Sequence, residues 1–237
     1  MNVYEERFRL KSKDVDLYRR LRCSRLFELL QEASIRHTEL LGMGREKTLD
    51  RGLLWIVGLQ RAEIRRMPEY DEEIVLHSWP GKTMRLFFPR YYSLETVDGE
   101  ELVKASALWS LVDQQSRKLV FPDAWGVEID GQERGDELDA SSPPRRLPLS
   151  EQVHFTVPYS YVDLNGHMNN TRYFDLAQDL IPAAQEGRRL LTVQTEYVSE
   201  ARLGDDLSVR WGEDDGRYYL EGTAERCVFR MRMDYDR

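Results

Sequence analysis

The chain has 237 residues, and 34 Lys and Arg against 42 Asp and Glu give a formal net charge of −8. With 41% hydrophobic and 32% charged residues, it has the composition of a globular protein of one or two domains with a sizeable core. The acidic balance disfavours nucleic acid as a partner, and the longest apolar stretch, residues 53–59, is too short to span a membrane.

The first residues of the chain carry charges of both signs and lack the apolar region of a secretion signal, which predicts a cytoplasmic protein. Two cysteines, Cys23 and Cys227, are too few for a disulfide framework and form no C-x-x-C pair. We therefore expect both thiols to be reduced and partly buried.

An internal repeat organises the sequence. Three blocks of the first half recur in the same order in the second half: residues 15–17 as 162–164, residues 25–31 as 172–178, and residues 63–74 as 196–207. The offset is 147 for the first two blocks and 133 for the third, so the first half carries a longer segment between its helix and the strand that follows. Agreement of order and spacing predicts two copies of one structural unit.

Each copy is predicted to start with a short strand, residues 5–10 in the first and 152–158 in the second, and to continue with one helix. Apolar side chains at helical spacing mark the two helices: Leu26, Phe27, Leu29, Leu30 and Ala33, and Tyr173, Phe174, Leu176, Ala177 and Leu180. The expected N-caps are Ser24 for the first helix and Asn170 or Thr171 for the second. Gly42 and Gly44 are expected to end the first helix, and Pro182 to end or kink the second.

Several strands follow each helix. They are predicted at residues 54–64, 73–79, 85–97 and 102–112, and at residues 191–198, 206–211, 218–225 and 228–235. Asp98-Gly99 is expected to form a type I′ turn, with Asp215-Gly216 as the corresponding turn. One helix with four or more antiparallel strands, twice, is an α+β plan in which each sheet wraps around a central helix.

Residues 123–150 contain many charges together with glycines and prolines, a composition typical of a linker. We therefore expect a first unit at residues 1–122 and a second unit at residues 151–237.

The motifs of several enzyme classes are missing from the sequence. There is no Walker A loop, no G-x-S-x-G elbow and no H-E-x-x-H, and the four histidines lack metal-ligand spacing. The G-x-G at residues 42–44 follows a helix instead of opening one, which favours a helix end over a nucleotide site. We expect neither a metal nor a cofactor.

One polar cluster precedes the second helix and contains Asp163, Asn165, His167, Asn169 and Asn170. A carboxylate can fix the tautomer of an imidazole, and an amide NH₂ can donate a hydrogen bond to a developing oxyanion. A turn followed by a helix cap would explain the same residues, because Asn-Gly is a common turn dipeptide.

The repeat separates these two interpretations. At the offset of 147 the first copy has Asp16, Tyr18, Arg20, Arg22 and Cys23 in place of the five polar residues. A requirement for a turn or a cap would apply to both copies, so the shared scaffold does not need the amides and the imidazole. We infer that the second copy holds the reactive site and the first is its structural partner.

The string Asn165-Gly166-His167-Met168-Asn169-Asn170, followed by Tyr173 and by Glu196-Tyr197-x-x-Glu200, resembles the acyl-acyl carrier protein thioesterases of plant plastids and bacteria. The resemblance extends from Tyr4 to Tyr235 and implies a tandem hotdog fold that hydrolyses acyl-acyl carrier protein thioesters to free fatty acids. It implies a catalytic set of Asp163, Asn165, His167 and Glu200. The counterpart of Glu200 at the offset of 133 is Met67, although Glu200 could also be an ordinary residue at the end of a strand.

Where the family often has a cysteine directly after the glutamate, this chain has Ala201. The difference favours attack by water with Glu200 as general base over a cysteine nucleophile, and attack by Glu200 itself stays open. In this hypothesis Asn165 contacts the thioester carbonyl, His167 hydrogen-bonds water or substrate, and Asp163 orients the network.

The resemblance also implies that the first unit supplies an apolar tunnel, for which the candidates are Trp55, Ile56, Leu59, Phe87 and Phe88. Ordinary core packing is the alternative for these residues. An acidic acyl carrier protein would need local cations, for which two groups are candidates: Arg19, Arg20, Arg22 and Arg25, or Arg61, Arg65 and Arg66. Solvated charge on ordinary faces is the alternative for both groups.

An acyl-CoA thioesterase of hotdog type and a non-catalytic acyl-binding protein remain open functions, and a monomer and a homodimer are equally admissible.

Overall fold

The computed structural model describes residues 3–132, 134–139 and 142–237, and each half of the chain forms a strand, a long helix and four further strands, with one additional short helix in the second half. The first half forms β1 (Tyr4–Arg9), α1 (Cys23–Leu40), β2 (Leu53–Ile64), β3 (Glu73–Pro80), β4 (Phe87–Thr96) and β5 (Glu101–Asp113). The second half forms β6 (Glu151–Thr156), α2 (Arg172–Leu180), the short α3 (Pro182–Gln185), β7 (Leu190–Tyr197), β8 (Asp206–Asp214), β9 (Arg217–Thr223) and β10 (Cys227–Tyr235). The predicted strands and helices agree with these elements to within a few residues.

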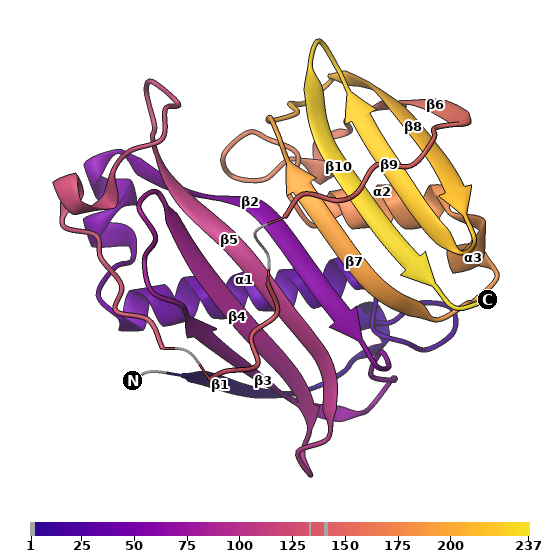
Figure 1. The fold of residues 1–237 in the computed structure, drawn as a ribbon, viewed down its shortest axis with the longest axis horizontal. Coiled ribbons are helices and arrows are strands. Elements are labelled where there is room, and N and C mark those ends of the chain that lie inside the picture. Colours follow the sequence, from indigo (N-terminus) through magenta and orange to yellow (C-terminus); the bar gives the residue numbers. More distant parts are fainter. Residues whose placement is uncertain (1–2, 133, 140–141) are drawn as a thin grey trace.

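All these strands belong to one antiparallel sheet, in the order β1-β3-β4-β5-β2-β7-β10-β9-β8-β6 (Figure 1). The order is symmetric about its centre, because β5, β4, β3 and β1 extend from β2 as β10, β9, β8 and β6 extend from β7. β2 and β7 pair from Leu59 opposite Glu196 to Glu63 opposite Thr192, and this ladder joins the two halves. The prediction of an α+β protein with two antiparallel units is confirmed as a tandem hotdog fold.

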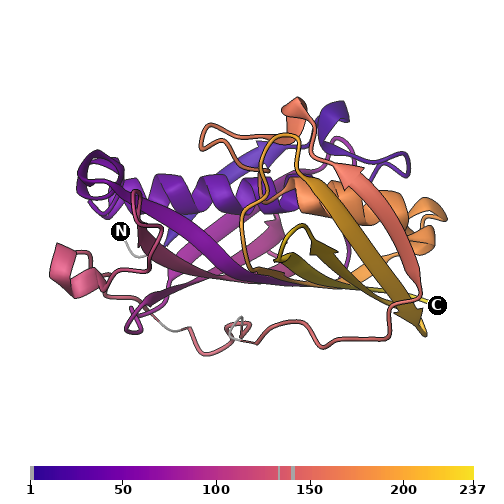
Figure 2. The ribbon, with the colours of Figure 1, turned by 90° about the horizontal axis from the view of Figure 1, so that it is seen from above.

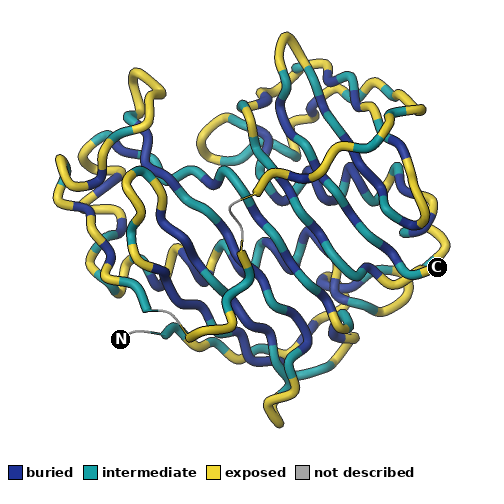
Figure 3. Tube along the Cα trace, viewed as in Figure 1, coloured by how far each residue is buried: buried dark blue, intermediate teal, exposed yellow. Residues whose placement is uncertain are grey.

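The two helices lie end to end on one face of the sheet (Figure 2). Phe27 of α1 and Phe174 of α2 occupy equivalent positions of the repeat, and their rings stack with centroids 4.1 Å apart and an interplanar angle of 11°. Both side chains are fully buried, within an apolar cluster that draws residues from both halves. Figure 3 shows buried positions along the strands and helices and exposed ones in the loops between them. The two halves therefore share one core.

The helix ends are set by the turns that precede and follow them. The carbonyl of Arg22 accepts the N–H of Leu26, so Arg22 is the N-cap of α1 and the prediction that Ser24 caps this helix is wrong. Thr171 is the N-cap of α2, as predicted, and the side-chain oxygen of Asn169 accepts its N–H at 2.9 Å. Ser24 instead lies buried in the first turn of α1.

The predicted helix terminators Gly42 and Pro182 are confirmed, whereas Gly44 has a φ of −84° and precedes the 3-10 turn Arg45–Lys47, so its predicted role in ending α1 is wrong. Gly42 takes a left-handed φ of +73° just after α1, a conformation that favours glycine, and its N–H donates to the carbonyl of Glu39. Pro182 is the first residue of α3, and α2 ends before it at Leu180.

The two Asp-Gly turns differ. Asp215 and Gly216 both have positive φ, 56° and 78°, as a type I′ turn between β8 and β9 requires. In the β4–β5 turn only Gly99 has a positive φ, and its N–H donates to the carbonyl of Thr96, so the type I′ prediction for Asp98-Gly99 is wrong. This loop is longer, and a longer loop selects a turn in which one glycine takes the left-handed conformation.

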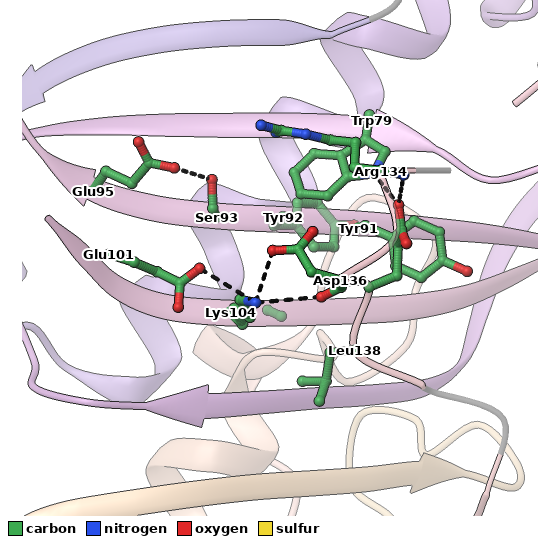
Figure 4. Close-up of a pocket in the computed structure, with 12 residues that line it drawn as sticks. Trp79, Tyr91, Tyr92, Ser93, Glu95, Glu101, Lys104, Arg134, Asp136 and Leu138 are labelled. Carbon is green, nitrogen blue, oxygen red and sulfur yellow. Dashed lines mark hydrogen bonds and ion pairs between the residues drawn. The ribbon is translucent and has the colours of Figure 1, made fainter. Parts of the chain in front are cut away.

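The described residues between β5 and β6 form no strand, and residues 134–139 and 142–150 cross the face of the sheet opposite the helices (Figure 2). Lys104 Nζ lies 2.9 Å from the carboxylate of Asp136 (Figure 4). The indole N–H of Trp79 donates to Glu137 at 3.3 Å. The guanidinium of Arg134 lies over the ring of Trp79, 4.7 Å from its centroid. The crevice beneath this segment is about 40 Å³, too small to hold a substrate.

No helix within the described part of the chain has the length and apolar character needed to cross a bilayer.

Candidate active site

A tight turn precedes α2 and carries three of the predicted site residues. The N–H of Asp163 donates to the carbonyl of His167 at 2.9 Å, and Oδ1 of Asp163 accepts the N–H of Asn165 at 2.8 Å. Gly166 takes a φ of +78°, which lets the chain reverse within this short span. The carboxylate of Asp163 therefore holds the turn closed from inside.

The turn before α1 is built in the same way. The N–H of Asp16 donates to the carbonyl of Arg20 at 2.8 Å, and Oδ1 of Asp16 accepts the N–H of Tyr18 at 2.8 Å. Arg19 takes the position of Gly166 and has a φ of +64°. Asp16 and Asp163 thus perform the same structural task, and the two turns differ in the side chains that they display.

A second contact fastens the turn to the segment that follows β7. The N–H of Met168 donates to the carbonyl of Ala201 at 2.8 Å, and His167 forms an isolated bridge with Arg202. Because Glu200 directly precedes Ala201, this contact brings its carboxylate beside the imidazole, with His167 Nε2 and Glu200 Oε2 3.1 Å apart.

Arg117 from the first half completes the cluster. Its Nη2 forms an ion pair with Glu200 Oε1 and lies 3.2 Å from Nε2 and 3.4 Å from Nδ1 of His167. Arg117 has a φ of +56° in the turn after β5, where its N–H donates to the carbonyl of Asp113. The catalytic candidates of the second half therefore meet a guanidinium that the first half supplies.

Burial lowers the pKa of His167 from its ordinary value, because it disfavours the imidazolium. The positive charge of Arg117 acts in the same direction, whereas the carboxylate of Glu200 opposes it. The net result is a neutral imidazole near neutral pH, which can accept or donate a hydrogen bond according to its tautomer.

The four predicted residues line one cavity of about 330 Å³. Its walls also include Arg117, Arg226, Asn170, Tyr173, Tyr197, Ser199 and the first residues of β2. The hydroxyl of Tyr197 lies 2.9 Å from Gln60 Oε1 and 3.0 Å from the carbonyl of Asn170, so it ties this wall to β2 and to the start of α2. Of the polar cluster only Asn169 is engaged in capping, through its contacts with Thr171.

A second cavity of about 340 Å³ adjoins the first and lies in the first half. We call it the acyl cavity; its lining includes Leu53, Leu54, Trp55, Phe88, Trp109, Ile129 and Asn165. Leu54, Trp55 and Asn165 line both cavities, so Asn165 stands at the junction.

The tunnel candidates divide between these cavities. Trp55 and Phe88 line the acyl cavity and meet edge to face with ring centroids 4.7 Å apart, and Ile56 lines the cavity with Glu200. Leu59 and Phe87 line neither, so those two predictions are wrong. Side chains alternate between the faces of a strand, which separates Phe87 from Phe88, and a β-bulge between Val57 and Leu59 shifts the alternation in β2.

Neither predicted arginine group lies at the cavity with Glu200. Arg20 and Arg66 line a third cavity of about 270 Å³ at the opposite end of the β2–β7 ladder. Arg66 there pairs with Glu72 at 2.7 Å, as is typical of ordinary surface charge. The cations that do line the cavity with Glu200 are Arg117 and Arg226, and Arg226 has no ion pair among the described residues.

Neither cysteine lines the cavity with Glu200, and burial raises the pKa of Cys23 well above its ordinary value. Both observations argue against a thiolate nucleophile. Among residues 3–132, 134–139 and 142–237, no three His, Cys, Asp or Glu side chains are grouped to hold a metal ion.

The sheet order, the paired helices and the cavity between the halves define a two-unit hotdog protein. The family models of the acyl-ACP thioesterase N-terminal domain and C-terminal domain match residues 1–122 and 146–233. The chain belongs to the acyl-ACP thioesterase family.

Relatives of known sequence are distant. Palmitoyl-acyl carrier protein thioesterase of Cuphea hookeriana is 23% identical over 214 residues, covering 84% of this chain and 52% of that protein. The protein of the same description from Arabidopsis thaliana is 22% identical over 250 residues, covering 98% and 60%. Both are described as chloroplastic. The chain thus spans little more than half the length of the curated relatives that it matches.

Solved structures share the fold. An acyl-ACP thioesterase from Bacteroides thetaiotaomicron superposes with a TM-score of 0.86 at 23% identity, covering 99% of this chain and 98% of that one. The 12:0-ACP thioesterase of Umbellularia californica has a TM-score of 0.84 at 19% identity, covering 99% and 97%.

Proposed function

We propose that this protein hydrolyses acyl-acyl carrier protein thioesters to free fatty acids, by attack of water on the thioester carbonyl. One observation carries the proposal. Asn165, His167 and Glu200 converge on a cavity that continues, at Asn165 and Trp55, into an apolar cavity of a size suited to an acyl chain. Membership of the acyl-ACP thioesterase family supports the reaction class.

In this mechanism Glu200 is the general base. It takes a proton from a water molecule while the water oxygen attacks the carbonyl carbon. The neutral imidazole of His167, 3.1 Å from Glu200, holds that carboxylate and the water in position. Negative charge develops on the carbonyl oxygen, to which the amide NH₂ of Asn165 donates. The carbon–sulfur bond then breaks, and the departing thiolate receives the proton from Glu200.

Asp163 and Arg117 act as positioning residues. Asp163 holds the N–H of Asn165 and so fixes the turn that displays the amide. Arg117 binds Glu200 Oε1 and leaves Oε2 directed at His167, so only one carboxylate oxygen is engaged by the guanidinium. The first unit, residues 1–122, would thus enclose the acyl chain and supply Arg117, while the second unit, residues 151–237, supplies the reacting groups and residues 123–150 connect them.

An acidic carrier protein would dock at the mouth of the cavity with Glu200. Arg226 supports this placement, because it lines that cavity from the β9–β10 turn and pairs with no carboxylate in the described parts of the chain. Docking through such a cation predicts an affinity for carrier protein that falls with salt.

The proposal is tested by thiol release from carrier-protein thioesters of graded chain length, with the same acyl chains on CoA as a parallel series. Glu200→Gln should lower kcat by roughly 10²–10⁴-fold, the usual contribution of a general base, without loss of structure. Glu69→Gln, in the equivalent segment of the first half, is the matched control and should keep the wild-type rate. Wild-type protein that holds the thioester without releasing thiol would contradict the proposal, and faster turnover on CoA would redirect it to a CoA thioesterase.

A further inference from the structure

A buried arginine lines the acyl cavity and has no carboxylate partner among the described residues. Arg90 lies in β4 and is 4% exposed. Its Nη1 donates to Nδ1 of His37 at 3.0 Å and to Oγ of Ser78 at 3.1 Å, and its Nη2 donates to Oγ1 of Thr38 at 3.1 Å. All three acceptors are uncharged, because an imidazole nitrogen that accepts a hydrogen bond belongs to a neutral ring.

A buried charge without a counter-ion is costly, and it is normally paired. Burial lowers the pKa of Arg90, and among the described residues no carboxylate offsets that effect. A guanidinium has five N–H groups, of which three are used here, so two can still donate. Arg90 therefore keeps both a charge and hydrogen-bonding capacity that the described parts of the protein do not satisfy.

The other charged groups of the acyl cavity are satisfied. The carboxylate of Glu39 accepts the backbone N–H of Arg45 at 2.8 Å. The side chain of Arg45 pairs in turn with Asp50 at 2.9 Å. Arg90 thus remains as the charge in this lining that no carboxylate of the described chain balances.

The strand register places Arg90 far from the proposed reaction centre. Trp55, at the junction of the two cavities, pairs with Leu111 of β5, whereas Arg90 pairs with Ala107 of the same strand. Four residues along β5 and two strand spacings across the sheet correspond to about 13 Å and about 10 Å. The two side chains are therefore separated by on the order of 15 Å, with apolar groups such as Phe88 and Trp109 lining the space between.

We propose that the acyl cavity accepts chains whose distal end carries an oxygen acceptor, a hydroxyl or a carboxylate, and that Arg90 binds this oxygen. The inference rests on the proposed thioesterase function. With the thioester carbonyl at Asn165, the methylene groups lie against apolar side chains and the far end of the chain reaches the guanidinium. A terminal methyl at the same place would leave the two free N–H groups unsatisfied, which is the basis of strong discrimination in polar sites.

The test uses three dodecanoyl thioesters of carrier protein that differ at the far end: a methyl, a hydroxyl or a carboxylate. We expect kcat/KM of the wild-type protein to be about tenfold or more higher for at least one oxygenated chain than for the methyl chain. Arg90→Met should reduce that ratio to about one. Arg36→Met, which removes an exposed arginine of the same sheet-and-helix unit, should leave the ratio unchanged.

The wild-type comparison does not depend on how well a variant folds. Thr38→Val removes one acceptor of the guanidinium and leaves a third N–H group free to donate, so the preference should persist or increase in this variant. Equal or faster turnover of the methyl chain by the wild-type protein overturns the inference and leaves the proposed function intact. A preference that survives in folded Arg90→Met overturns the role of Arg90. Failure to hydrolyse any of the three chains would count against the proposed function as well.

Discussion

The two ends of the β2–β7 ladder carry the same backbone device with different side chains. At each end an aspartate closes a turn before a helix, and an N–H donates at 2.8 Å to the segment that follows the central strand of that half. The second-half turn displays Asn165 and His167 beside Glu200, whereas the equivalent positions of the first half hold Tyr18, Arg20 and Met67. The fold thus supplies two equivalent backbone frames, each a turn before a helix together with the segment after a central strand. The side chains displayed on each frame account for the difference between them.

The first-half turn has a structural task of its own. The hydroxyl of Tyr18 donates to the carbonyl of Gln185 at 2.6 Å, and Nη1 of Arg20 donates to the carbonyl of Gly187 at 3.0 Å. A Cβ at position 187 would lie 2.5 Å from the ring of Tyr18, so glycine is required there. Tyr18 and Arg20 therefore bind the first half to the end of α3. Their counterparts Asn165 and His167 instead line the cavity with Glu200.

The largest contrast is expected between His167 and Arg20. His167→Ala should lower kcat for a carrier-protein thioester by roughly 10³-fold while the melting temperature stays near that of the wild type. Arg20→Ala should do the reverse, with normal turnover and lower stability. Steady-state kinetics and thermal melts on both variants check this pair, and a comparable loss of turnover in Arg20→Ala would contradict the division of tasks.

A substitution in the shared core should lower the free energy of unfolding by the same amount whether it is made in the first half or in the second. Phe27→Ala and Phe174→Ala each remove one ring of the central stack and should lower the free energy of unfolding by about 3–5 kcal/mol. Phe121→Ala, at an exposed position, is the control and should have little effect. Denaturant titration measures these values, and two well-separated unfolding transitions would show that the halves do not share one cooperative core.

The contact between the first-half turn and the end of α3 should contribute less to the free energy of unfolding than the central ring stack. Tyr18→Phe removes the hydrogen bond to Gln185 and should cost about 1 kcal/mol of stability, with kcat unchanged. Tyr159→Phe removes a hydroxyl from a largely exposed tyrosine and serves as the control. If Tyr18→Phe were as stable as the wild type in a denaturant titration, the first-half turn would not have the structural task assigned to it.

The smallest expected effect is a shift in pH dependence. His167 is faced by Glu200 and Asp163, which raise its pKa, and by Arg117 and Arg202, which lower it. The lowered pKa keeps the imidazole neutral to lower pH, so its acid limb in kcat/KM should lie below the ordinary histidine range.

Arg117→Met removes one positive neighbour, which makes the imidazolium easier to form and raises the pKa of His167. The acid limb should therefore move to higher pH in this variant and stay in place in Lys118→Met. A pH–rate profile for each protein measures the shift, and a limb that moves to lower pH would contradict the assignment of Arg117.

The repeat and the polar cluster can be recognised in the sequence because both are local. Residues that close one turn or follow one helix lie within a few positions of each other, and the offset of 147 by itself aligns Asp16 with Asp163. The strands likewise follow from the apolar pattern, which is why the predicted elements agree closely with the sheet.

The remaining parts of the site depend on contacts across the fold. Arg117 lies in a polar turn without a motif, and only the pairing of β2 with β5 and β7 brings it to Glu200. Arg90 does carry a local signal, because it is the one charge within the aromatic-rich stretch of residues 87–92. Ser24 failed as a cap because the preceding turn fixes where the helix starts.

Because one gene encodes both frames, a substitution in the first turn leaves the second untouched. Two identical subunits could not diverge in this way, since every change would appear in both of their reacting centres at once. Under the proposed function, covalent fusion lets selection use the first turn to hold the two halves together and the second turn to carry the reacting groups.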